Sequence, residues 1–337
     1  MYNRPVPKPL PRALLPILRR LSSGGFHSGQ ALARDHGLSR ASVFNLLRLA
    51  RDMGLRIHAV RGRGYRLAEA AEWLDAQAVA QALGPLADVY SLQVLDSIDS
   101  TNTALMQAAL AGAPSGTVVC AEHQFSGKGR RGRQWHATLG GSLAFSVLWR
   151  FDEGIQTLGG LSLAAGLAVA RALNRHSRYA VKLKWPNDVL VDFRKLAGIL
   201  IEIQGDIDGP SLAVVGIGLN VRLGSRQREA IDQAVIDLSE MAVQTGRNQL
   251  LAACLQELHD VVETLRQQGF RALRSEWEAL HAHAGQPVML SLPNGEKVSG
   301  VAAGVDDTGA FLLCNEQGEY VSYNGAEIRL RPAGRRA

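Results

Sequence analysis

The spacing of apolar residues changes twice along the chain, and these two changes divide it into three folding units. Up to about residue 68, apolar residues recur at helical spacing in short segments that begin with good capping residues. From there to about residue 282, runs rich in β-branched residues alternate with helical stretches. The remainder contains only short strand-like runs separated by turn residues. We therefore predict an α+β protein with a small helical unit, a mixed body and a small all-β unit.

The first unit has the pattern of a winged helix-turn-helix. Leucines recur at helical spacing from Leu14 to Leu21, and Ser28 and Ser39 can each cap a further helix. The stretch "LRIHAVRGRGYRL" then alternates apolar and polar residues around a glycine-rich turn, which is typical of a β-hairpin. Three short helices followed by a hairpin make a winged helix. A helical protein-interaction module of the same shape is the alternative.

The charge distribution favours a polyanionic partner for this unit. Residues 1–68 hold 13 of the 37 Lys and Arg but only 2 of the 31 Asp and Glu, which is +11 and leaves −5 for the rest. Such asymmetry is typical of nucleic-acid binding, although a solvated basic face would look similar. The third helix would enter the major groove, and the wing arginines would lie near phosphates. The predicted DNA contacts are Arg40, Ser42, Asn45 and Arg48 on the helix, and Arg61, Arg63 and Arg66 on the wing.

Several protein classes are disfavoured by the sequence. The three cysteines are widely scattered, so neither a disulfide framework nor a zinc ribbon is expected. The first 20 residues lack the apolar core of a signal peptide. The uncharged run Gly154 to Ala170 is short for a membrane span. We expect a cytoplasmic protein with no membrane partner.

The body is predicted to contain a mixed, largely antiparallel sheet. Its strand-like runs are "GTVVCAEHQ", "GSLAFSVLWR", "YAVKLKWPNDVLVD", "KLAGILIEIQGD" and "SLAVVGIGLNV", and several follow one another directly. Helices are predicted at "TNTALMQAALAG", at "LGGLSLAAGLAVARALNRH" and along an apolar stripe from Leu250 to Leu265. The predicted domains are a winged helix at 1–68, a helical linker at 69–84, the body at 85–282 and a small SH3-like β-barrel at 283–332.

One loop of the body, "SGKGRRGRQW" at 126–135, combines four cationic side chains with three glycines. It lacks the P-loop pattern, and no predicted helix follows it directly. Glycines would let backbone N–H groups approach a phosphate, and the arginines would supply forked donors. A disordered surface loop is the alternative, and these residues alone do not decide between the two.

Four other short motifs lie in the same body. "DSIDSTN" places hydroxyl and amide groups before a helix, where they can cap it or bind a polar ligand. "KWPND" puts a proline inside strand-like sequence, which marks a break where side chains can be re-aimed. "RKLAGIL" places Lys195 at the head of an apolar strand, and "GIGLN" ends a strand with glycines and an amide.

Together these motifs resemble the family of biotin protein ligases that also repress biotin synthesis. "DSTN", "GKGRRGRQW", "KWPND", "RKLAGIL" and "GIGLN" occur in the family's order, and the three-unit layout matches as well. Lipoate ligases share the central fold but lack the glycine-arginine loop and the winged helix. One position departs from the family, which commonly has Arg where this chain has Lys128. Lysine keeps the charge but loses the fork for a bidentate contact.

The resemblance implies a two-step reaction and a regulatory role. The family activates biotin with ATP to biotinyl-5′-AMP and transfers biotin to a lysine of biotin carboxyl carrier protein. Mg²⁺ is expected on the phosphates, with no dedicated metal ligands. The adenylate-bound homodimer would bind operator DNA of the biotin genes. The alternatives are a non-catalytic biotin-sensing repressor and a lipoate-type ligase, but a sensor of biotin alone would need few of these cations.

The resemblance also implies roles for individual residues. Lys195, Arg130 and Asp188 are the expected catalytic residues, with Asp188 orienting the acceptor amine. The expected biotin contacts are Ser100, Thr101, Asn102, Gln124, Lys128, Gly129, Arg130 and Lys195. The expected ATP and adenylate contacts are Arg130, Arg131, Arg133, Trp135, Asn187 and Asn220. The loop at 126–135 would serve as a lid over the adenylate.

Overall fold

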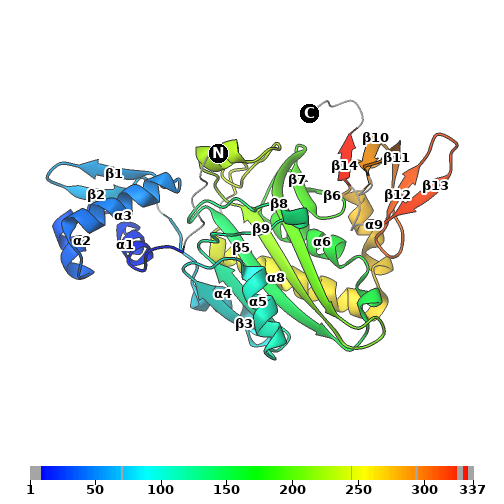
Figure 1. The fold of residues 1–337 in the computed structure, drawn as a ribbon, viewed down its shortest axis with the longest axis horizontal. Helices are drawn as coiled ribbons and strands as arrows, with labels where there is room; N and C mark the ends of the chain where they lie inside the picture. The colour runs from blue at the N-terminus through cyan, green and yellow to red at the C-terminus, as the bar shows by residue number, and fades with distance from the viewer. Residues whose placement is uncertain (1–8, 70, 244, 293–294, 325–328, 333–337) are drawn as a thin grey trace.

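Three units follow one another along the longest axis of the molecule (Figure 1). The structure is a computed structural model, and it describes residues 9–69, 71–243, 245–292, 295–324 and 329–332. The winged helix lies at one end, the sheet of the body in the middle and the small β domain at the other end. The fold class predicted from the sequence is confirmed.

The first unit is a winged helix-turn-helix. Its elements are α1 (Leu14–Leu21), α2 (Gly29–Asp35), α3 (Arg40–Asp52), β1 (Ile57–Val60) and β2 (Gly64–Leu67). The two predicted serine caps form: Ser28 Oγ accepts from the Ala31 N–H and Ser39 Oγ from the Ser42 N–H, both at 3.0 Å. The leucines of α1 and the apolar face of α3 are buried against each other, so the basic residues are left on the outside of the unit.

The body is built on a seven-stranded mixed sheet. Its order is β3-β4-β5-β9-β8-β7-β6, and every neighbouring pair is antiparallel except β3 and β4. The first of these strands was not predicted from the sequence, and the predicted break at Pro186 separates two of them. The bounds are β3 (Ser91–Leu95), β4 (Thr117–Ala121), β5 (Ser142–Phe151), β6 (Lys182–Lys184), β7 (Asp188–Val191), β8 (Arg194–Gly205) and β9 (Ser211–Asn220).

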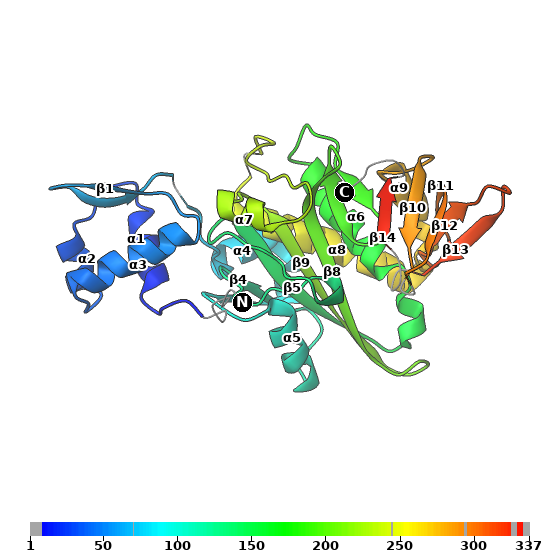
Figure 2. The ribbon, with the colours of Figure 1, turned by 45° about the horizontal axis from the view of Figure 1, so that its top comes forward.

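Helices cover both faces of this sheet (Figure 1 and Figure 2). On one face α6 and α8 pack into the main core, and on the other α5 forms a smaller core with β4, β5 and β9. A stretch at Ile155–Asn174 is long and apolar enough to span a membrane, but most of α6 is buried in this core. The remaining elements of the body are α4 (Ala76–Leu83), η1 (Gly84–Val89), α5 (Thr101–Leu110), η2 (Arg130–Gly132), η3 (Ile155–Leu158), α6 (Leu161–Asn174), α7 (Ser225–Ala230), α8 (Arg247–Gln268) and α9 (Arg271–Ala279).

The segment predicted as a helical linker contains α4. Val79 and Leu83 of this helix are buried in the main core beside α8. The helix is therefore part of the packed body, and the stretch between Leu67 and Asp75 makes the connection to the winged helix. The domain boundaries themselves remain predictions.

The C-terminal unit is a five-stranded antiparallel sheet in the order β13-β12-β11-β10-β14. Phe311, Leu313 and Val288 are buried and join the core of the body, so this unit is packed against the body. Its strands are β10 (Pro287–Ser291), β11 (Lys297–Val305), β12 (Phe311–Cys314), β13 (Tyr320–Tyr323) and β14 (Arg329–Pro332).

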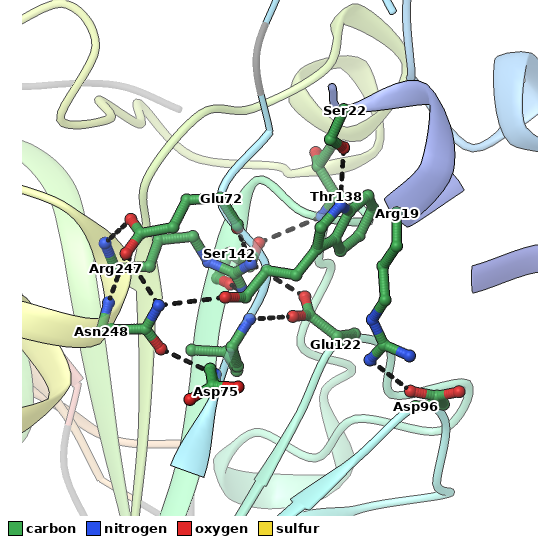
Figure 3. A network of polar contacts seen from close by, with 12 residues as sticks. Arg19, Ser22, Glu72, Asp75, Asp96, Glu122, Thr138, Ser142, Arg247 and Asn248 are labelled. Carbon is green, nitrogen blue, oxygen red and sulfur yellow. Dashed lines mark hydrogen bonds and ion pairs between the residues drawn. The ribbon is translucent and has the colours of Figure 1, made fainter. Parts of the chain in front are cut away.

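A buried polar network fixes the connection between the winged helix and the body (Figure 3). Arg247, the first residue of α8, pairs with Glu122 at 2.8 Å, and the side chains are 4% and 0% exposed. Its guanidinium also donates to the backbone carbonyl oxygens of Ser142 and Glu72 at 2.7 and 2.9 Å. The Glu72 carboxylate accepts from the first backbone N–H groups of α8, which compensates the unpaired donors of that helix end.

Two further contacts join α1 to the body. Arg19 forms an ion pair with Asp96 at 2.7 Å, and the Trp73 indole donates to Ser22 Oγ at 2.7 Å. Both lie near the network around Arg247 (Figure 3). The winged helix is therefore joined to the body at α1, and the segment that follows it is fixed to the body at Glu72 and Trp73.

Candidate active site

The motifs of the body converge on one small cavity on the α5 side of the sheet. Its floor consists of Gly198 on β8 and of Gly216 and Gly218 on β9. A Cβ atom on Gly216 would lie 1.9 Å from Asn102 Oδ1, and one on Gly218 would lie 2.4 Å from the Trp135 ring. Only glycine leaves room for these neighbours, so the two glycines of "GIGLN" form a cradle.

Hydroxyl and amide groups form one wall of the cavity. Ser100 caps α5, and the Thr101 N–H donates to Gln124 Oε1 at 2.7 Å. Thr101 Oγ1 lies 3.1 Å from this oxygen and 2.7 Å from Ser146 Oγ, so the two hydroxyls and the Gln124 amide form one hydrogen-bonded chain. Ser146 lies within β5; it carries no motif of its own and was not predicted from the sequence. All these groups are fixed before a ligand arrives.

Asn102 lies in the same wall, but its amide is largely committed to the protein. Its Oδ1 accepts from Ser146 Oγ at 2.6 Å. Its Nδ2 donates to the Leu200 carbonyl oxygen at 3.2 Å and to Glu202 Oε2 at 2.9 Å. Since Nδ2 has two protons, both are used. Glu202 is a second residue that the sequence analysis missed.

The glycine-arginine loop folds into a tight hairpin over the cavity. The Gly129 N–H donates to the Arg133 carbonyl oxygen at 2.7 Å, and the Trp135 N–H to the Gly127 carbonyl oxygen at 2.8 Å. Arg131 at its tip has a φ of 57°, a left-handed conformation that a non-glycine residue rarely adopts. Lys128, Gly129 and Arg130 line the cavity, whereas the side chains of Arg131 and Arg133 are exposed.

Trp135 occupies the cradle of the site. Its ring lies over Gly218, and its buried Nε1 has no hydrogen-bond partner in the described structure. The remaining cavity measures about 60 Å³, whereas ordinary ligand pockets start at about 300 Å³. Trp135 must therefore move before a ligand of ordinary size can bind on the glycine floor.

Arg130 connects the loop to the "KWPND" motif. Its Nη1 donates to Asn187 Oδ1 at 3.2 Å, and Asn187 Nδ2 donates to the Ile199 carbonyl oxygen at 2.8 Å. Burial lowers the pKa of the Arg130 guanidinium, and the neighbouring positive charge of Arg131 lowers it further. A cation in such surroundings is stabilised by an anionic ligand.

Lys195 reaches the cavity from the start of β8. Its Nζ lies 2.6 Å from Asp188 Oδ1, and both side chains are about 15% exposed. The ammonium also lies 5.8 Å from the centre of the Trp135 ring. Asp188 opens β7, directly beside β8, so the ion pair joins two adjacent strands and fixes the direction of the lysine.

Asn220 lies beyond the lining of the cavity. It is 2% exposed, and its Nδ2 donates to the carbonyl oxygens of Lys195 and Ile236. Its Oδ1 is buried without a hydrogen-bond partner in the part of the chain that the structure describes. The amide therefore braces the lysine strand.

Five of the seven predicted DNA contacts are exposed on the winged helix, whereas Ser42 and Arg66 are half-buried. Arg40, Asn45 and Arg48 are exposed along α3, and so is Phe44. The Ser42 hydroxyl is hydrogen-bonded to Ser39 Oγ at 2.9 Å.

The wing arginines differ in how they are held. The guanidinium groups of Arg63 and Arg66 lie 4.5 and 4.9 Å from the centre of the Phe26 ring, and Arg61 is exposed in the turn. Stacking on an aromatic ring restricts two of the three arginines while leaving their charge available.

The three units match known families. Residues 94–220 match the biotin/lipoate A/B protein ligase family, residues 14–66 an HTH domain, and residues 283–331 the biotin protein ligase C terminal domain.

Two relatives align with nearly the whole of this chain. The bifunctional ligase/repressor BirA of Escherichia coli strain K12 is 36% identical over 95% of this chain and 97% of its own length. The protein of that name in Bacillus subtilis is 30% identical over 90% of this chain and 94% of its own. Among solved structures, the biotin protein ligase of Aquifex aeolicus in complex with biotin and ATP has a TM-score of 0.61 and 27% identity, and covers 72% of this chain and 99% of its own.

Proposed function

Because the chain belongs to the family of bifunctional biotin ligases and repressors, we propose that it biotinylates a carrier protein and represses biotin genes. In the first step it activates biotin with ATP to biotinyl-5′-AMP. In the second step it transfers biotin to a lysine of biotin carboxyl carrier protein. We also assign it to the cytoplasm, where both the carrier and the DNA would be available.

One observation carries the proposal: a glycine cradle with a fixed polar wall is joined to three cations. The cradle suits a compact apolar bicycle, and the hydroxyl and amide groups suit its ureido group. Lys128, Arg130 and Lys195 line the same cavity. A sensor of biotin alone would not need this set of cations, so the arrangement favours a ligase over a non-catalytic repressor.

In the activation step a carboxylate oxygen of biotin attacks the α-phosphorus of ATP, and the bond to the leaving pyrophosphate breaks. Both reactants are anions, so positive charge must offset their repulsion. Lys195 and Arg130 are positioned for this by Asp188 and Asn187. Arg131 and Arg133, exposed on the hairpin, would reach the phosphates when the loop closes, and Asn220 Oδ1 would accept from the adenine amino group.

In the transfer step the acceptor amine attacks the carbonyl carbon of the adenylate, and AMP leaves as the amide forms. Asp188, the first residue of β7, can orient that amine while Lys195 remains on the phosphate. The hairpin must exclude water in the meantime, because acyl adenylates hydrolyse. Trp135, once displaced from the cradle, would cover the edge of the ligand.

Mg²⁺ would accompany ATP through its phosphates and water. Among the described residues, no group of three or more His, Cys, Asp or Glu could hold a metal ion. Mg²⁺ commonly needs no dedicated protein cage at triphosphate sites, so this arrangement is compatible with Mg²⁺ held by the phosphates.

Repression requires that a dimer binds operator DNA through two winged helices. The body offers a sheet edge for this dimer. Strand β8 pairs with β7 as far as Gly198 and with β9 as far as Gly205. Among the described strands, the last part of β8 is therefore paired on one side and open on the other. An open strand edge can pair with a second copy. Ile203 and Ile207 beside it are 43% and 65% exposed, so pairing would also bury apolar surface.

The ligase function is tested by incubating the protein with biotin, ATP and Mg²⁺ and then with lipoate in place of biotin. We expect pyrophosphate release and a bound biotinyl-AMP, detected by mass, with biotin only. Pyrophosphate release with lipoate but not with biotin would establish the lipoate-type alternative. Biotin binding without pyrophosphate would establish the non-catalytic sensor.

The dimer is tested by sedimentation of the free, biotin-bound and adenylate-bound protein, alongside a gel shift on operator DNA. We expect dimerisation and tight DNA binding with the adenylate. Ile203→Lys should stay monomeric yet still form the adenylate, because a buried unpaired charge opposes edge pairing. A wild-type protein that stays monomeric with adenylate, or binds DNA equally well when empty, would contradict the proposed switch.

A further inference from the structure

Glu202 on β8 contacts two residues of the candidate site with its two carboxylate oxygens. Oε2 accepts from Asn102 Nδ2 at 2.9 Å, and Oε1 lies 3.9 Å from Lys128 Nζ. We propose that Glu202 is a positioning residue that orients Asn102 and holds Lys128 in the empty protein, in competition with the biotin carboxylate. This inference rests on the proposed function, because it assigns the competing anion to biotin.

The contact with Asn102 determines which way the amide points. Its Oδ1 faces Gly216 and accepts from Ser146, so Nδ2 must point toward β8. There the Leu200 carbonyl oxygen and the Glu202 carboxylate take one proton each. If the amide were flipped, Nδ2 would face the Ser146 hydroxyl, and Oδ1 would face the Leu200 carbonyl oxygen and the Glu202 carboxylate, which are both acceptors and cannot bond to it. Glu202 therefore keeps the Asn102 oxygen on the cavity side, where a ureido N–H would need an acceptor.

The contact with Lys128 is of a different kind, because it is loose and exchangeable. The Lys128 and Glu202 side chains are 47% and 34% exposed, and their charged atoms are 3.9 Å apart. Such pairs contribute little to stability. An ammonium group lacks the planar set of N–H donors with which a guanidinium can bind two carboxylates side by side. Lys128 must therefore leave Glu202 to bind a ligand carboxylate.

The exchange involves the hairpin as well. Lys128 forms an isolated β-bridge with Gln134, and Gln134 precedes the Trp135 that fills the cradle. Contact with Glu202 thus holds the hairpin in the arrangement that keeps Trp135 over Gly218. A ligand that takes Lys128 removes one of the contacts that stabilise the empty state.

The experiment separates the two roles by measuring binding of biotin and of its alcohol analogue, in which CH₂OH replaces the carboxylate. Glu202→Gln keeps an oxygen acceptor for Asn102 but removes the charge that competes for Lys128. It should tighten biotin binding about twofold to fivefold, the range for a half-exposed ion pair, and tighten binding of the alcohol by less, because the alcohol has no carboxylate to gain from the freed Lys128 ammonium. Glu202→Ala removes both contacts and should weaken both ligands.

Two controls complete the test. Glu263→Gln removes an exposed carboxylate that pairs with Arg266 on α8, and it should change neither affinity. In a Lys128→Met background, Glu202→Gln should lose its effect on biotin. If wild-type protein binds biotin but Glu202→Gln alters neither ligand, or alters both equally, the role of Glu202 is refuted. If wild-type protein does not bind biotin, the proposed function itself fails.

Discussion

Replacing Arg247 by methionine should destabilise the body far more than the loss of an ordinary ion pair. Methionine keeps the apolar stem of the side chain but removes the guanidinium that pairs with Glu122. The Glu122 side chain is 0% exposed, and among the described residues its carboxylate would keep only the hydrogen bond from the Leu74 N–H, at 2.5 Å. Breaking a buried pair by removing one partner costs about 3–5 kcal/mol. At roughly 2–4 °C per kcal/mol for a body of this size, the melting temperature should fall by about 6–20 °C.

Thermal melts followed by circular dichroism would check this expectation. Arg266→Met is the matched control, because Arg266 pairs with Glu263 on the same helix with both side chains 39% exposed. That pair should contribute only about 0.5 kcal/mol. The double variant Arg247→Met with Glu122→Met should be more stable than Arg247→Met alone, since it leaves no buried charge unpaired. An Arg247→Met protein that melts within about 2 °C of the control would refute this account of the network.

Four further outcomes are expected. Lys195→Ala should lower pyrophosphate release at least about tenfold, as the loss of a transition-state charge donor does, and unchanged release would remove Lys195 from the site. Arg130→Gly should still form the adenylate but release it early, so that lysines of bystander proteins become biotinylated on a blot; an active variant that stays selective would argue against the lid. Arg61→Ala with Arg63→Ala should reduce the slope of log Kobs against log salt for operator DNA by about 2, whereas an unchanged slope would exclude the wing from phosphate contact. Burial lowers the pKa of His281 and of His283 from 6.5 to about 4, so between these pH values the unfolded chain binds protons that the folded chain does not. The free energy of unfolding should therefore fall as the pH drops from about 6.5 toward 4, by up to about 1.4 kcal/mol per pH unit for each histidine. His283→Phe should make the melting temperature depend less on pH.

Local patterns in the sequence predict much of this fold because their physical causes are local. The caps at Ser28 and Ser39 and the buried stripe from Leu250 to Leu265 follow from helix geometry alone. The break at Pro186 falls between β6 and β7 because proline cannot donate to a ladder. The strand at Ser91–Leu95 was missed because it is short and lies at the edge of the sheet.

The site was predictable only in part because its geometry depends on contacts between distant segments. The glycines of "GIGLN" are visible in the sequence, but their role as a floor under Asn102 and Trp135 depends on tertiary packing. Ser146 and Glu202 carry no motif, and each meets Asn102 from a different strand. Arg247 and Glu122 are 125 residues apart, so no local pattern could indicate that they form a buried pair.

The central claim is that biotin binds on the glycine floor that Trp135 now covers, and a calorimetric titration of one variant tests it most directly. Gly218→Ala places a methyl group 2.4 Å from the present ring position and fills the floor. Overpacking of this kind costs about 1–3 kcal/mol, so biotin should bind roughly fivefold to 150-fold more weakly than to wild-type protein. Gly166→Ala on α6, where a Cβ meets only ordinary contacts, should bind like wild type. Equal affinity for biotin in the folded Gly218→Ala protein and in wild type would place the ligand elsewhere and contradict the account.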